Sequence, residues 1–105
     1  MDRAYRSING NNLQMLMKKG NVVLIDVRSV QDYNKSHIPK AINIPFEILQ
    51  NKKNIPYEYK NLNVIVYCKS GIKSSKVAAL LYDNGFKNVY NLSGGISSYK
   101  GELVR

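Results

Sequence analysis

The chain has 105 residues, enough for one domain with one core, and 44% of them are hydrophobic, which is typical of a globular protein. No apolar run approaches the roughly 20 residues of a membrane-spanning helix, and the first ten residues lack the apolar stretch of a signal peptide. The formal net charge is +9, but no basic run exceeds two residues and no nucleic-acid-binding motif is present, which argues against a nucleic-acid partner.

The first half of the chain alternates between strand-like and helix-like stretches. NVVLID is typical of a strand buried on both faces, and the preceding NNLQMLMKKG places apolar residues on one helical face before a glycine stop. In chain order we predict a short edge strand (5–8), a helix (11–20), a buried strand (21–26), a short helix (29–36), a strand between two prolines (41–44) and a helix opened by proline (45–52).

The second half continues the alternation around the VIVY run. The pattern predicts another buried strand at residues 64–67 and a last strand at residues 88–92. Between them it predicts a helix at residues 74–86, in which Gly85 and Phe86 form a C-terminal cap. Strands that alternate with helices predict a mainly parallel sheet covered on both faces. Because ligands bind such sheets at the carboxyl ends of their strands, we expect the functional site where VIVY ends.

The only cysteine, Cys68, follows VIVY directly, so an internal disulfide is excluded and a cysteine-based metal site is disfavoured. The tight loop 69–73 feeds a helix start, which turns several backbone N–H groups toward one point. These groups, with the charges of Lys69 and Lys73, would lower the pKa of Cys68 enough to ionise most of the thiol at neutral pH. We interpret Cys68 as a nucleophile; the alternative is a small buried hydrophobic residue at a strand end.

Four segments, in this order and spacing, resemble a single-domain rhodanese, a sulfurtransferase homology domain: VVLIDVRSVQDY (22–33), SHIPKAINIP (36–45), VIVYCKSGIKSSKVAALL (64–81) and GFKNVYNLSGGI (85–96). The resemblance implies an α/β, rhodanese-like fold: a five-stranded, mostly parallel sheet flanked by helices on both faces. It also implies a thiosulfate sulfurtransferase-type enzyme with no metal and no organic cofactor. We expect one cytoplasmic, monomeric domain, residues 1–105, without a membrane partner.

The resemblance further implies a two-step sulfur transfer through Cys68. Its thiolate would take the sulfane sulfur of a donor such as thiosulfate as a persulfide, and cyanide or a thiol would then accept that sulfur. Backbone N–H groups of the active-site loop would cradle the persulfide, and the loop residues are Lys69, Ser70, Gly71, Ile72, Lys73 and Ser74. The expected partners are a small-molecule donor and acceptor, with a protein sulfur donor as an alternative to the small donor.

Two other functions are alternatives to this one. A phosphatase of the same fold would use a longer loop with arginine six positions after the cysteine, and Ser74 stands there instead. A second alternative is a module that relays sulfur or senses oxidants through Cys68 without turnover. Rhodaneses commonly carry arginine where Lys69 and Lys73 stand here, so the positive charge is kept but the planar bidentate fork is lost.

Several other residues resemble functional groups but are interpreted as structural. His37, the only histidine, is expected to tie a turn to the sheet rather than act as a base. Arg28 and Asp32 have the spacing of a helical ion pair. Gly94 and Gly95 are expected to permit a close backbone approach beside the cysteine loop.

Overall fold

Five strands form one sheet in the computed structural model, which describes residues 5–105. The strand order is β1 (Arg6–Ile8), β5 (Asn88–Leu92), β4 (Asn63–Tyr67), β2 (Val22–Asp26) and β3 (Ile42–Asn43). All four pairings between neighbours are parallel, so this sheet is wholly rather than mostly parallel. The predicted rhodanese-like α/β fold is confirmed, and all five predicted strands are present.

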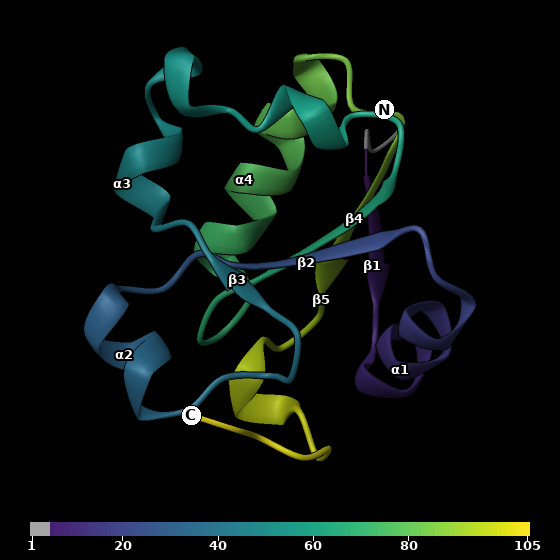
Figure 1. Cartoon of the computed structure of the whole chain (residues 1–105), viewed down its shortest axis with the longest axis vertical. Helices are drawn as coiled ribbons and strands as arrows, with labels where there is room; N and C mark the ends of the chain where they lie inside the picture. The colour runs from purple at the N-terminus through teal and green to yellow at the C-terminus, as the bar shows by residue number, and fades with distance from the viewer. Residues whose placement is uncertain (1–4) are drawn as a thin grey trace.

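Four helices connect the strands and cover both faces of the sheet (Figure 1). They are α1 (Gly10–Lys19), α2 (Val30–Lys35), α3 (Phe46–Leu49) and α4 (Ile72–Asp83). The chain also contains three short 3₁₀ helices, at Lys52–Asn54, Tyr57–Tyr59 and Ile96–Ser98. Within residues 5–105 none of the helices combines the length and the apolar character needed to cross a membrane.

The two faces of the sheet carry separate hydrophobic cores, because neighbouring strand residues point to opposite faces. Val64 and Val66 of β4 pack with α3 and α4 in one core, which also contains Cys68. Ile65 and Tyr67 of the same strand pack with α1 in the other core. Side chains buried on both faces explain why these strands appear as continuous apolar runs in the sequence.

Two helix boundaries differ from the predictions. The predicted helix 45–52 ends at Leu49, because Asn51 is extended and its side chain accepts a hydrogen bond from the Lys53 N–H, which starts a separate turn. Helix α4 starts two residues earlier than predicted, directly after Gly71, whose φ of +98° is the left-handed conformation. The predicted C-terminal cap is confirmed: the Phe86 N–H donates to Leu81 and the Gly85 N–H to Tyr82.

Candidate active site

Cys68 lies at the carboxyl end of the central strand β4, and its chain turns directly into α4. Gly71 makes this tight connection possible, because its left-handed conformation is disfavoured for residues with a Cβ. A Cβ at Gly71 would also press against the Gly94 N–H nitrogen at 3.3 Å. The turn therefore aims the first N–H groups of α4 back at the strand end.

Three groups form hydrogen bonds with the Cys68 sulfur. The Gly71 N–H donates to Sγ over 3.1 Å and the Ser74 N–H over 3.3 Å, and the Ser74 hydroxyl lies 3.3 Å from Sγ. Burial alone would raise the pKa of the Cys68 thiol. The hydroxyl and N–H of Ser74, with the N–H groups of Gly71 and Ser70, outweigh this effect and lower the pKa below its ordinary value.

The direction of the predicted pKa shift is confirmed, but its predicted cause is partly wrong. Hydrogen bonds at the helix start lower the pKa, and the charges of Lys69 and Lys73 are not among the causes. Lys73 is directed elsewhere: its Nζ lies 3.9 Å from the Glu47 carboxylate and 5.6 Å from the centre of the Phe46 ring. Its charge is therefore shared with a carboxylate rather than devoted to the sulfur.

A buried asparagine on the neighbouring strand supports the sulfur-binding groups. Asn91, on β5, accepts a hydrogen bond from the Ser74 hydroxyl through Oδ1, and its Nδ2 donates to the Gly71 carbonyl over 3.3 Å. Ser74 and Asn91 are both buried. Asn91 was not among the predicted site residues, although a polar side chain inside the apolar strand NVYNL is a visible signal in the sequence.

The Gly94–Gly95 turn holds the loop from outside, as predicted. The Ile96 N–H donates to the Cys68 carbonyl over 2.9 Å and the Ser97 N–H to the Lys69 carbonyl over 3.0 Å. A Cβ on Gly95 would collide with the Lys69 carbonyl, so only glycine permits this approach.

A pocket of about 440 Å³ opens over Cys68. Its floor and rim come from the ends of β2 and β4 and the starts of three helices, and it is lined by Val27, Arg28, Ser29, Asp32, Glu47, Cys68, Lys69, Ser70, Ile72 and Lys73. Only 5% of the Cys68 surface is exposed, so a ligand reaches the sulfur through this pocket. The predicted loop residues thus converge: four line the pocket beside Cys68, while Gly71 and Ser74 donate to its sulfur.

Arg28 forms its ion pair with Asp26, so the predicted Arg28–Asp32 pair is wrong. Arg28 Nη2 lies 2.7 Å from the carboxylate of fully buried Asp26, and Nε donates to both carboxylate oxygens. The Asp32 N–H instead donates a hydrogen bond to the hydroxyl oxygen of Ser29, which caps the start of α2. Arg28 lines the pocket, and buried Asp26 compensates its charge.

His37 does not reach the Cys68 pocket. Its Nδ1 donates to the Tyr33 carbonyl over 2.9 Å and its ring stacks on Tyr33 at 3.8 Å. Its backbone pairs with Val104 near the C-terminus. The structural interpretation of His37 is confirmed, although its ring is tied to α2 rather than to the sheet.

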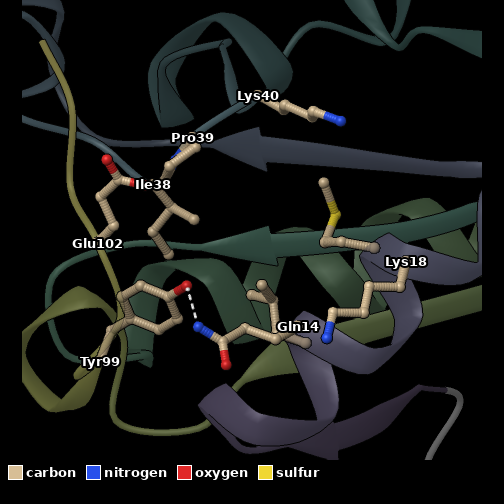
Figure 2. Close-up of a pocket in the computed structure, with 9 residues that line it drawn as sticks. Gln14, Lys18, Ile38, Pro39, Lys40, Tyr99 and Glu102 are labelled. Carbon is tan, nitrogen blue, oxygen red and sulfur yellow. Dashed lines mark hydrogen bonds between the residues drawn. The ribbon is translucent and has the colours of Figure 1, made fainter.

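A second hollow, of about 520 Å³, lies under α1 and has no cysteine in its lining (Figure 2). Figure 2 shows Gln14 bonded to Tyr99, with Lys18 and Lys40 on the rim and Glu102 on the C-terminal segment. Across residues 5–105, no three His, Cys, Asp or Glu side chains gather as metal ligands. The polar groups that converge on a nucleophile are therefore found at Cys68 and not in the larger hollow.

Comparison with known sequences gives one family. A family model described as "Rhodanese-like domain" matches residues 10–102. The chain is 36% identical over 96 residues to the thiosulfate sulfurtransferase GlpE of Coxiella burnetii, which covers 91% of this chain and 88% of the relative. It is 33% identical over 96 residues to a tRNA uridine(34) hydroxylase of Buchnera aphidicola, covering 88% of this chain but only 31% of that longer protein.

Solved structures agree with this comparison. The crystal structure of a rhodanese-related protein from Thermoplasma volcanium superposes with a TM-score of 0.82 at 28% identity. The alignment covers 95% of this chain and 98% of that one. The agreement therefore extends over nearly the full length of both chains.

Proposed function

This chain belongs to the rhodanese-like domain family, and from that premise we propose that it is a sulfurtransferase that carries sulfane sulfur on Cys68. The observation that carries the proposal is the convergence of the Gly71 and Ser74 N–H groups on the Cys68 sulfur. Such a cradle stabilises a sulfur anion in a place where burial alone would disfavour it. The similarity to a thiosulfate sulfurtransferase over most of both chains supports the same chemistry.

In the first half-reaction the Cys68 thiolate attacks the outer sulfur of the donor. With thiosulfate, a new S–S bond forms to Sγ, the bond between the two donor sulfurs breaks, and its electron pair leaves with sulfite. The Gly71 and Ser74 N–H groups hold the attacking anion, and the pocket above it admits the donor. Because the pKa of Cys68 is lowered, a larger fraction of the thiol is ionised at neutral pH than for an ordinary cysteine.

In the second half-reaction an acceptor removes the outer sulfur of the persulfide. Cyanide or a thiolate attacks that sulfur, the bond to Sγ breaks, and the electron pair returns to Cys68 as thiolate. Cys68 is thus a good leaving group for the same reason that it is a ready nucleophile: its anion is stabilised in the cradle.

Intact-protein mass spectrometry tests the proposal. After incubation with thiosulfate and removal of the small molecules, the protein should gain the mass of one sulfur atom, and cyanide should remove it. The control is Cys68→Ser, which should gain nothing. A protein that gains no sulfur but is still rapidly alkylated at Cys68 at pH 6.5 would favour the relay or oxidant-sensing alternative. A protein that gains no sulfur and resists alkylation would make Cys68 a structural residue.

A further inference from the structure

The mouth of the Cys68 pocket is electrically balanced although the chain as a whole is strongly basic. The cations facing it are Arg28, Lys69 and Lys73, and the carboxylates are Asp32 and Glu47. Arg28 has a 10% exposed side chain and is neutralised by buried Asp26. The remaining two lysines meet two carboxylates, so the net formal charge at the mouth is zero, against +9 for the chain.

This balance bears directly on the charge of the sulfur donor. Thiosulfate is a dianion, and Lys73, the cation on the first turn of α4, lies 3.9 Å from the Glu47 carboxylate. Each rim carboxylate repels a sulfur donor with two negative charges twice as strongly as it repels a donor with one negative charge. Lys69 and Lys73 attract the dianion by the same factor, so at a balanced mouth the dianion gains no electrostatic advantage that would offset its larger desolvation cost.

The same mouth offers apolar surface that a small inorganic ion does not use. Ile72 lines the pocket with 66% of its surface exposed, the largest value among the exposed large hydrophobic residues of the described chain. A pocket of about 440 Å³ lies in the range that accepts organic ligands, whereas thiosulfate has only five atoms.

We propose that the preferred sulfur donor is a singly charged sulfane-sulfur compound with an apolar body, and that Glu47 and Ile72 set this preference. The inference rests on the proposed sulfurtransferase function and concerns its substrate. For an organic thiosulfonate, Cys68 Sγ attacks the outer sulfur, the S–S bond to the sulfonyl group breaks, and its electron pair leaves with the sulfinate. Charge is conserved, because one monoanion enters and one leaves while Cys68 passes from thiolate to persulfide anion.

Three donors separate the effects of charge and apolar contact. Thiosulfate is a small dianion, methanethiosulfonate a small monoanion and benzenethiosulfonate a monoanion with an apolar ring. Initial rates with cyanide as acceptor, divided by the uncatalysed rate of each donor with cyanide, remove differences in intrinsic reactivity. We expect corrected kcat/KM to rise in the order in which the donors are named, with benzenethiosulfonate at least about tenfold above thiosulfate.

Three variants identify the residues responsible. Glu47→Gln should lower KM about fivefold for thiosulfate and about twofold for either thiosulfonate, as expected for a charge roughly 8 Å away in water. Glu102→Gln makes the same change of net charge beside the second hollow (Figure 2) and should leave all three values unchanged. Ile72→Ser should raise KM about fivefold for benzenethiosulfonate and leave methanethiosulfonate unaffected.

The outcomes separate this inference from the function on which it rests. Persulfide formation with thiosulfate preferred over both thiosulfonates, or equal effects of Glu47→Gln and Glu102→Gln, would overturn the inference and leave the sulfurtransferase intact. Absence of a persulfide on Cys68 with all three donors would overturn both.

Discussion

At the scale of single residues, one hydroxyl hydrogen has two acceptors. The Ser74 hydroxyl donates to Asn91 Oδ1 while its oxygen lies 3.3 Å from Cys68 Sγ. A thiol can donate its own hydrogen to that oxygen, whereas a thiolate needs a donor. We expect the Ser74 hydroxyl to turn from Asn91 to the sulfur when Cys68 ionises, which links the strand β5 to the charge state of the nucleophile.

Ser74→Ala should raise the pKa of Cys68, because the variant loses the hydroxyl that stabilises the thiolate. At pH 6.5 fewer molecules would carry the thiolate, and alkylation by iodoacetamide should be about tenfold slower, as expected for loss of a hydrogen bond to a charged group. The difference should vanish well above the pKa of the variant. Ser75→Ala is the matched control, since the Ser75 hydroxyl donates to the Ile72 carbonyl rather than to the sulfur. Equal profiles for the two variants would contradict the role given to Ser74.

Lys73→Gln should change the alkylation profile of Cys68 less than Ser74→Ala does. Lys73 is 3.9 Å from Glu47 and is not among the main causes of the lowered pKa of the thiol. The measurement is the rate of alkylation between pH 5 and pH 9 for both variants. A larger shift in Lys73→Gln would restore the lysine charges as the main cause of the lowered pKa.

The sequence was sufficient to find Cys68 and its loop, but not the partners that make the site work. A cysteine between a strand and a helix start is a local pattern, and so are the N–H groups that follow it. Asn91 is 17 positions from Ser74 and meets it only because β5 lies beside β4. The ion pair between Lys73 and Glu47 likewise joins α4 to α3, so its effect on the lysine charge was not visible locally.

At the scale of elements, the active-site loop is clamped between its own helix and the turn after β5. N–H groups of residues 96 and 97 hold the carbonyls of Cys68 and Lys69, while the N–H groups of Gly71 and Ser74 face the sulfur. The carbonyl groups of the loop thus face the turn after β5, and its N–H groups face the sulfur. Such a fixed arrangement keeps the cradle formed before a donor arrives.

Gly95→Ala should disrupt this clamp. Its φ of +61° is unfavourable for alanine, and the new Cβ would collide with the Lys69 carbonyl. We expect a loss of more than about 3 kcal/mol in the free energy of unfolding, from backbone strain and overpacking together, and a raised pKa of Cys68 as the loop moves.

Gly85→Ala provides the control for strain alone. Gly85 has a φ of +94° but open space where its Cβ would lie, so alanine should cost only about 1–2 kcal/mol and leave Cys68 alkylation unchanged. Urea unfolding and alkylation rates measure both effects. If the two variants lose equal stability, the collision at Gly95 does not constrain the loop.

Element types were predictable from the sequence because each is encoded locally. Continuous apolar runs gave the strands, and the Gly85–Phe86 pair gave the end of α4. The helix boundaries were predicted less accurately where a hydrogen bond from a nearby side chain determines where the helix ends. Asn51 ends α3 early by capping the next turn, and the sequence alone does not show whether an asparagine caps a turn or lies in a loop.

At the scale of the whole molecule, the sheet order brings three separate stretches of the chain to one edge. The ends of β2, β4 and β5 are neighbours in the order β5-β4-β2, so Asp26 and Arg28, Cys68, and the Gly94–Gly95 turn all meet there. Parallel strands need crossover helices, and α4 begins at that same edge. The topology alone therefore places a nucleophile, a helix start and a glycine turn together.

The whole fold should also respond to the charge state of this one sulfur. The pKa of Cys68 is lower in the folded chain than the roughly 8.5 of an unfolded cysteine. Between those two values the unfolded chain binds more protons, so the free energy of unfolding rises with pH. The stabilisation is complete above the unfolded pKa and is lost as pH falls through the folded one.

Cys68→Ser removes this titration, so the stability difference, wild type minus variant, should increase from acidic pH to about pH 9. Other groups that titrate in this range are common to both proteins and cancel in the difference. Urea unfolding at intervals of pH, with a reductant present, measures it. A difference that stays constant, or that shrinks as pH rises, would mean that folding does not favour the thiolate. The cradle would then lack the stabilising effect on which sulfur transfer through Cys68 depends.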